Sequence, residues 1–202
     1  KDMGLETCMT LGMLTDDQAA QLRDAGLDYY NHNIDTSERY YSEVITSRTF
    51  ADRLNTLDRV RAAGINVCSG GIIGMGETWE DRLDMAISLA ELGIESIPIN
   101  ALMPIPGTGM EGRPQLPAAD ILRTIAFFRY INPTANIRLA AGRKLLPENG
   151  ATALRAGASA SITGNMLTTS GTTIKEDMAM IATLGLMNRE EDCRAVTGTC
   201  GA

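Results

Sequence analysis

The sequence predicts an α/β protein, and more specifically an incomplete (β/α)8 barrel of the TIM type. Three observations lead to this prediction. Apolar runs alternate with amphipathic stretches along the chain, glycines punctuate this alternation, and polar residues stand where several apolar runs end. Alternation of strands with helices requires a parallel sheet with helices outside it.

The amphipathic stretches predict helices over residues 16–25, 48–63, 79–92, 118–131, 148–156 and 175–185. A glycine follows four of them and directly precedes an apolar run. At this position a glycine closes the last helical turn in the left-handed conformation without a steric penalty. The four are Gly26, Gly64, Gly93 and Gly157.

Two helix starts carry capping signals. Residues 15–18 read as a capping box, and Thr78 with Asp81 is a looser version of the same device. In the helix that follows Thr78, the acidic residues lie mostly outside one apolar stripe. We expect that stripe to be buried, and its members are Leu83, Ile87 and Ala90.

The apolar runs predict strands over residues 5–11, 28–34, 66–73, 95–103, 136–141 and 159–166. This is about six of the eight strand–helix units of a complete barrel, which has roughly 250 residues. A doubly wound sheet is the competing architecture. We favour the barrel because polar residues recur near the C-terminal ends of several strands, where barrel active sites are built.

The composition of the chain argues against several classes of protein. A net charge of −7 argues against a nucleic-acid partner, because phosphate binding needs clustered Lys and Arg. No apolar run approaches the roughly 20 residues that a membrane helix requires. The four cysteines form no CxxC pair, which argues against a zinc finger, and their density argues against a disulfide scaffold. We therefore predict a cytoplasmic protein.

Polar residues interrupt three segments that otherwise read as buried strand ends: residues 30–36 (YNHNIDT), 67–77 (VCSGGIIGMGE) and 137–143 (IRLAAGR). Burying such groups costs free energy unless something pairs with them, so we expect a ligand there. These polar residues also have interpretations that need no ligand. Cys8 and Cys68 could be buried core thiols, and Arg138 could form a buried ion pair.

These segments together resemble the biotin synthase family, in an order and spacing that are highly specific. The resemblance rests on residues 4–12 (GLETCMTLG), 27–36 (LDYYNHNIDT), 67–78 (VCSGGIIGMGET), 98–102 (PINAL), 137–143 (IRLAAGR) and 162–169 (ITGNMLTT). It implies a (β/α)8 barrel with radical S-adenosylmethionine chemistry. The implied activity is that of a sulfurtransferase, which inserts sulfur into dethiobiotin in the last step of biotin biosynthesis.

The resemblance implies a [2Fe–2S] cluster deep in the barrel, from which the inserted sulfur is drawn. Cys8 and Cys68 match two of its cysteine ligands, and Arg138 matches its arginine ligand. These three residues are the implied metal-binding and catalytic set. Thiolates suit iron–sulfur clusters because soft sulfur anions bind iron and neutralise its charge.

The resemblance also implies an S-adenosylmethionine site formed by Asn33, Asp35, Arg53, Gly70, Ile72 and Gly74. Asn33 and Asp35 alternate on a predicted strand and so share one face. A carboxylate there can accept from ribose hydroxyls. For these residues the ordinary alternatives are a strand-end turn for Asn33 and Asp35, a helix-surface ion pair for Arg53, and phosphate binding for the glycine-rich segment.

Three further residues complete the expected site. Asn100 lies in a strand, where an unpaired amide is costly, and the resemblance implies that it binds dethiobiotin together with Asn33. His32, the only histidine, is expected to be a structural residue with satisfied hydrogen bonds, facing away from Asn33. Glu77 is expected to anchor the turn that follows Gly74 rather than to react.

One feature of the family is absent from this sequence. The CxxxCxxC loop that holds the S-adenosylmethionine-cleaving [4Fe–4S] cluster does not occur, and neither does a third [2Fe–2S] cysteine on a strand. We expect both in the first two strand units, before Lys1. The chain is therefore interpreted as a fragment with strands three to eight, which alone is expected to be inactive.

The predicted organisation is a partial barrel over residues 1–188 and a flexible tail over 189–202 that carries Cys193 and Cys200. The implied partners are an electron donor of the flavodoxin type and a second copy of the chain, with no nucleic acid and no membrane. Alternatives are a hydrogenase-maturation or methylornithine-synthase type of barrel, and a non-catalytic remnant of a barrel.

Overall fold

The fold is described from a computed structural model of the chain, which covers residues 2–165 and 171–187. The chain divides into two compact units, and each is described by itself. The larger unit comprises Cys8–Ser161, and the smaller one combines Lys1–Thr7 with Ile162–Ala202. The predicted tail over residues 189–202, with Cys193 and Cys200, lies outside the described residues, as do residues 166–169 of the ITGNMLTT segment.

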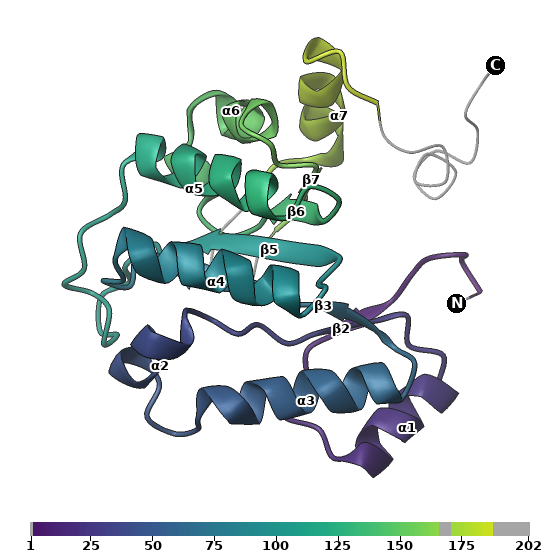
Figure 1. The fold of residues 1–202 in the computed structure, drawn as a ribbon. Coiled ribbons are helices and arrows are strands. Elements are labelled where there is room, and N and C mark those ends of the chain that lie inside the picture. The colour runs from purple at the N-terminus through teal and green to yellow at the C-terminus, as the bar shows by residue number, and fades with distance from the viewer. Residues whose placement is uncertain (1, 166–170, 188–202) are drawn as a thin grey trace. The chain divides into compact units, whose positions relative to one another are not determined.

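The larger unit is built on a parallel sheet, as the sequence predicts (Figure 1). Its strands pair in the order β1-β2-β3-β5-β6-β7, and β4 pairs with β5. All the paired strands run parallel. The strands are β1 (Cys8–Met9), β2 (Tyr29–Asn31), β3 (Asn66–Cys68), β4 (Gly71–Ile73), β5 (Ser96–Ala101), β6 (Asn136–Leu139) and β7 (Ala160–Ser161).

One predicted strand, over residues 66–73, appears as the two short strands β3 and β4. Both pair with β5, through Cys68 opposite Ser96 and Gly71 opposite Ile99, so the register is the same on either side of the break. At the break lies Gly70, where a Cβ atom would collide with the backbone oxygen of Pro98. The glycine therefore permits a close approach of two neighbouring chain segments.

The helices of the larger unit are α1 (Asp16–Asp24), α2 (Glu38–Val44), α3 (Phe50–Ala62), α4 (Trp79–Glu91), α5 (Ala118–Ile131) and α6 (Ala151–Arg155). All except α2 were predicted. Capping boxes begin α1, α3 and α4, and the predicted glycine after each of these helices has a positive φ. Two 3-10 turns, η1 (Arg143–Leu145) and η2 (Pro147–Gly150), precede α6.

The smaller unit holds one helix in its described part, α7 (Ile174–Thr183), which was predicted over residues 175–185. A complete capping box between Thr173 and Glu176 begins this helix. The hydroxyl of Thr172 also donates a hydrogen bond to Asp177, at 2.9 Å. Across the described ranges of both units, no helix has the length and apolar character needed to cross a membrane.

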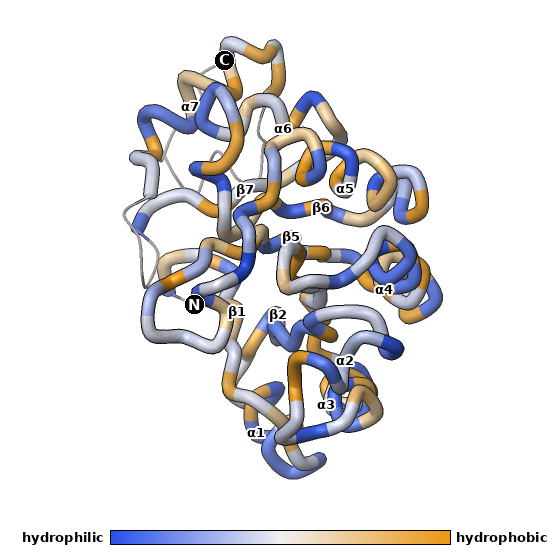
Figure 2. The backbone as a smooth tube through the Cα atoms, turned by 90° about the vertical axis from the view of Figure 1, so that its left-hand side faces the viewer, coloured by the Kyte–Doolittle hydropathy of each residue, from blue (hydrophilic) through white to orange (hydrophobic). Residues whose placement is uncertain are grey.

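The register of the sheet separates two kinds of side chain. Figure 2 shows α3, α4 and α5 along one side of the strands. The strand residues of the hydrophobic core are almost fully buried and include Tyr30, Val67, Ile97, Ile99, Ile137 and Leu139. Because side chains alternate along a strand, the residues between these positions share the opposite face. That inner face carries Cys8, Asn31, Cys68, Ser96, Asn100 and Arg138.

Helix α2 has no counterpart in the sequence-based prediction. Ser37 caps its first turn by accepting a hydrogen bond from the backbone NH of Tyr40. The Ser37 hydroxyl then donates to the Asp81 carboxylate at 2.8 Å. Asp81 also accepts from the Thr78 backbone NH at 2.8 Å and pairs with Arg39 at 2.9 Å. Asp81 therefore joins the first turns of α2 and α4.

The prediction that Leu83, Ile87 and Ala90 form the buried side of α4 is wrong. Leu83 and Ile87 are exposed by 43% and 39%, whereas the buried residues of this helix are Asp81, Arg82, Met85, Ala86 and Leu89. Apolar residues occur around most of this helix, so periodicity alone did not select the buried side. The tether from Asp81 to α2 and the ion pair between Arg82 and Glu77 lie on the side that faces the protein.

The first prediction concerns this tether. Burial raises the pKa of Asp81, but hydrogen bonds from Thr78, Ser37 and Arg39 outweigh it and lower the pKa to about 2. The stabilisation is therefore complete above the ordinary pKa near 3.8 and is lost as pH falls through about 2. At pH 7, Asp81→Asn should reduce the free energy of unfolding in urea by about 2 kcal/mol.

Asp84→Asn is the matched control on the same helix. The Asp84 carboxylate contacts the same arginine at 3.4 Å, but its side chain is 51% exposed. A solvent-exposed ion pair contributes little, so this variant should change the free energy of unfolding by less than about 0.5 kcal/mol. Equal losses in the two variants would show that the Ser37 and Thr78 bonds to Asp81 contribute nothing.

Candidate active site

Three residues distant in sequence lie on the inner face of the sheet: Cys8 from β1, Cys68 from β3 and Arg138 from β6. Nη1 of Arg138 lies 3.9 Å from the sulfur of Cys68. The charges of Cys68 and Arg138 both act on the thiol of Cys8. The parallel strands thus bring together the predicted ligands of the [2Fe–2S] cluster.

Ser96 on β5 joins two of these groups and was not predicted. Its hydroxyl donates to the sulfur of Cys68 at 3.3 Å and accepts from Nη2 of Arg138 at 3.0 Å. What marks Ser96 as a site residue is its position opposite Cys68 on the neighbouring strand. Serine before an apolar strand is common, so the sequence alone could not single it out.

The two cysteines differ in environment. Cys68 is 1% exposed, whereas Cys8 is solvent-exposed, so the alternative of a buried core thiol fails for Cys8. Partial burial, followed by the neighbouring Cys68, raises the pKa of the Cys8 thiol, and Arg138 opposes this rise. The Cys8 thiol is therefore harder to ionise than a free thiol unless further positive charge lies nearby.

Arg138 does not form the buried ion pair that ordinary expectation assigns to it. Within the described part of the chain, its hydrogen bonds go to Ser96 and Cys68, and no carboxylate pairs with it. The same part of the chain contains no cluster of three or more His, Cys, Asp or Glu side chains that could hold a metal ion. The residues present thus fit only part of an iron–sulfur site: two sulfur ligands and one cation.

A second group of polar residues lies beyond β2. The predicted alternation of Asn33 and Asp35 on one strand is wrong, because β2 ends at Asn31 and Asp35 has a φ of 69°. Oδ1 of Asn33 accepts a hydrogen bond from the Gly70 NH at 3.1 Å. The carboxylate of Asp35 forms an ion pair with Arg53 of α3. Two residues of the predicted S-adenosylmethionine site therefore contact each other.

The ion pair only partly offsets the burial of Asp35. Burial raises the pKa of Asp35 by more than Arg53 and the more remote Arg48 lower it. Both arginines also act on His32. A ligand carboxylate can be bound by a guanidinium such as that of Arg53 through two hydrogen bonds.

The turn after β4 is fixed by Glu77. Its carboxylate accepts from the backbone NH of Gly74 at 2.7 Å and of Gly76 at 3.1 Å. It also pairs with Arg82 at 2.8 Å in a buried contact. Glu77 thus anchors the turn, as expected. Gly74 has a φ of 97°, which favours glycine, and its Cα faces Leu116 of the loop over residues 103–117.

Ile72 and Asn100 occupy paired positions on β4 and β5. The Asn100 amide donates to the backbone oxygen of Gly71 at 3.1 Å and accepts from the Ala141 NH at 3.2 Å. Asn100 therefore links β4 to the segment after β6. Its role in the sequence-based prediction was substrate binding, and these bonds show that the protein itself already holds the amide in place.

His32 is buried, with 2% of its surface exposed, but its side chain does not have all the hydrogen bonds that were expected from the sequence. Its backbone NH donates to the Cys68 oxygen at 2.9 Å. Its Nε2 has no hydrogen-bond partner among the described residues. Burial, with smaller contributions from Arg53 and Arg48, lowers the pKa of His32 to about 4. The imidazole is therefore neutral at pH 7.

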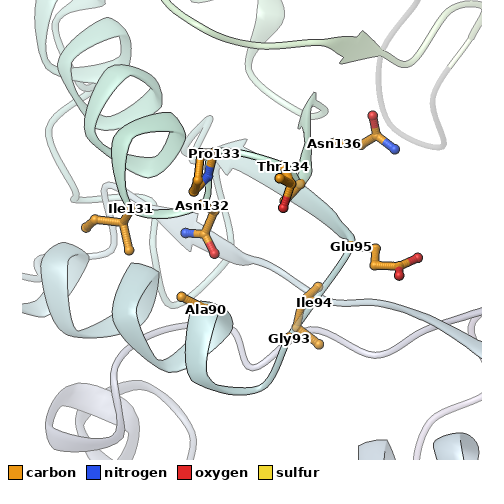
Figure 3. A pocket seen from close by; sticks show the side chains of 10 residues that line it. Ala90, Gly93, Ile94, Glu95, Ile131, Asn132, Pro133, Thr134 and Asn136 are labelled. Carbon is orange, nitrogen blue, oxygen red and sulfur yellow. The ribbon is translucent and has the colours of Figure 1, made fainter.

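A cavity of about 470 Å³ lies elsewhere, between the C-terminal ends of α4 and α5 (Figure 3). Its lining includes Ala90, Glu95, Ile131, Asn132 and Thr134. It lies next to the beginnings of β5 and β6, and none of the predicted site residues lines it. Active sites of barrels lie at the opposite ends of the strands.

Two family profiles and several solved structures match the chain. The family profile of the radical SAM superfamily matches residues 1–89, and that of the biotin and thiamin synthesis associated domain matches residues 98–187. The crystal structure of methylornithine synthase superposes with a TM-score of 0.80, 17% identity, and coverage of 94% of this chain and 60% of that one. The fold and the first profile define the class as a radical SAM barrel.

A second structure, that of HydG, a maturase of the [FeFe]-hydrogenase, superposes with a TM-score of 0.75 and 17% identity. It covers 96% of this chain and 50% of that one. These two likenesses establish the shared fold alone. The predicted incomplete (β/α)8 barrel, with parallel strands, is confirmed.

Curated relatives narrow the class to one family. Biotin synthase 2 of Paracoccus denitrificans is 56% identical over 190 residues, which cover 92% of this chain and 59% of the relative. The biotin synthase of Alkaliphilus metalliredigens is 50% identical over 92% of this chain and 58% of its own length. The chain belongs to the biotin synthase family. It spans somewhat less than three fifths of the length of these relatives.

The second prediction uses His32. Its pKa is lower in the folded than in the unfolded protein, so the unfolded state binds the extra proton first as pH falls. The stability should therefore be highest above the ordinary pKa of 6.5 and should decrease down to about pH 4, by at most about 3 kcal/mol. His32→Gln should remove this component from a series of unfolding curves recorded between pH 4 and 7.5. A wild-type profile that is flat over this range would contradict a buried, neutral imidazole.

Proposed function

We propose that this chain forms most of the substrate-binding barrel of a biotin synthase, an enzyme that inserts sulfur into dethiobiotin with radical S-adenosylmethionine chemistry. The observation that carries the proposal is that Cys8, Cys68 and Arg138 share the inner face of the sheet, with Arg138 next to the sulfur of Cys68. Soft sulfur ligands beside an arginine that lacks a described carboxylate partner are unusual for a structural core. The membership of the biotin synthase family supports the same activity.

In this proposal, Cys8 and Cys68 would hold a [2Fe–2S] cluster and Arg138 would lie against it. When bound, the cluster supplies the sulfur atom that enters the product. The chain's own contribution is charge: the guanidinium of Arg138 stabilises anionic sulfur, and Ser96 keeps the guanidinium directed at Cys68. The cleavage of S-adenosylmethionine requires a [4Fe–4S] cluster, whose CxxxCxxC ligands are absent from these 202 residues.

The group beyond β2 is proposed to bind S-adenosylmethionine. The guanidinium of Arg53 suits its carboxylate, and Asp35 can accept from ribose hydroxyls. The backbone at Gly70, Ile72 and Gly74 would line the adenine. The fixed turn at Glu77 supports this assignment, because it holds that backbone in one conformation.

Dethiobiotin is proposed to lie between the two groups, in contact with Asn33 and Asn100. Both amides are fixed by backbone hydrogen bonds, so a substrate would meet groups that are already oriented. A protein of the flavodoxin type is the proposed electron donor, and a homodimer in the cytoplasm is the proposed state of the enzyme.

The third prediction tests the cysteines in a chimaera. Residues 1–202 replace the matching segment of the Paracoccus denitrificans relative, and the chimaera is purified without oxygen. Cys8→Ala and Cys68→Ala should each abolish the visible absorption of the [2Fe–2S] cluster, because each removes a thiolate ligand. The [4Fe–4S] signal should remain. Unchanged spectra in both variants would mean that the two residues are ordinary thiols.

The fourth prediction tests Asp35. Asp35→Asn keeps the size of the side chain but removes a charged acceptor, which costs about 1.5–3 kcal/mol of binding. The affinity of the chimaera for S-adenosylmethionine should fall by roughly tenfold or more in equilibrium dialysis. Asp58→Asn, at an exposed position on α3, is the control and should bind normally. Equal affinity of the Asp35 variant and the wild type would refute this assignment.

A further inference from the structure

Arg53 is held by two partners on one edge of its guanidinium group. Nε donates to the hydroxyl of Tyr41 at 2.9 Å, and Nη2 donates to the carboxylate of Asp35. Nη1 makes no hydrogen bond among the described residues, and the side chain is 16% exposed. The opposite edge, formed by Nη1 and the second hydrogen of Nη2, therefore remains for a ligand.

Tyr41 is itself firmly placed. It is 2% exposed, and its ring packs edge-on against Phe50 at the start of α3, with the ring centroids 5.6 Å apart. It belongs to α2, whose first turn is tied to Asp81 of α4 through Ser37. The hydroxyl of Tyr41 is thus a fixed acceptor, held by three helices, that contacts Arg53 and not the ligand side of the guanidinium.

We infer that Tyr41 is a positioning residue for the S-adenosylmethionine carboxylate, acting through Arg53. The inference rests on the proposed function for the identity of the ligand. Asp35 alone fixes one guanidinium nitrogen and leaves rotation about that contact. The second bond, from Nε to Tyr41, fixes the plane of the group, which a ligand carboxylate needs in order to accept two parallel hydrogen bonds.

The test is Tyr41→Phe in the chimaera, which removes the hydroxyl and keeps the ring against Phe50. The Kd for S-adenosylmethionine should rise about fivefold to twentyfold, in line with the loss of one hydrogen bond to a charged group. KM for S-adenosylmethionine should rise in step, with kcat changed less than about twofold, because the hydroxyl acts on binding rather than on the reacting atoms.

Tyr30→Phe is the matched control. Tyr30 is also fully buried, and its hydroxyl donates to the backbone oxygen of Gly12 at 2.7 Å, away from Arg53. This variant should leave the Kd unchanged even if it lowers the stability. Equal losses of affinity in both variants, or none in Tyr41→Phe, would overturn the inference.

A double-mutant cycle separates positioning from general support. Once Arg53→Lys has removed the guanidinium, the additional change Tyr41→Phe should have little further effect on Kd. Additive effects would contradict the inference. The role of Tyr41 can also be tested without ligand, and therefore independently of the proposed function. Solvent exchange of the Arg53 Nε proton, followed by NMR, should be faster in Tyr41→Phe. Wild-type chimaera that fails to bind S-adenosylmethionine would refute the proposed function, and an unchanged exchange rate would refute the role of Tyr41.

Discussion

The register of the parallel sheet is the constraint on which the rest of the larger unit depends. Pairs such as Cys68 with Ser96 and Pro98 with Arg138 place the polar strand residues on one face and leave Tyr30, Ile97 and Ile137 for the helices. A shift of one residue would exchange the two sets and bury charge under the helices. The same register therefore determines both the core and the chemical character of the inner face.

Ion pairs at the ends of the strands then fix the loops around that face. Glu77 and Arg82 are both buried, and each charge would be costly alone. Glu77 also accepts hydrogen bonds from Gly74 and Gly76, and the Arg82 guanidinium stacks over the Trp79 ring at 4.6 Å. Glu77 and Arg82 hold the loop after β4 and are not among the residues proposed to bind a ligand.

Local signals in the sequence were sufficient for most of the fold and insufficient for the long-range contacts. Capping residues indicated the starts of α1 and α4, and glycines indicated the ends of α1, α3 and α4, because those signals act within a few residues. Helix α2 was missed because its support comes from Asp81, 44 residues after Ser37. Ser96 and the pair of Asp35 with Arg53 depend on tertiary placement in the same way, so the resemblance could indicate site residues but not their mutual contacts.

Arg138 shows how charge connects this fold to its proposed chemistry. A guanidinium is protonated at any physiological pH, so it requires a nearby negative charge or access to water. The described structure gives it a serine hydroxyl and a cysteine sulfur instead of a carboxylate. Burial and the neighbouring Cys68 raise the pKa of the Cys8 thiol, and Arg138 offsets only part of this rise. The arrangement becomes electrostatically balanced when both sulfurs are deprotonated and share a further cationic centre, which is the condition that iron binding would create.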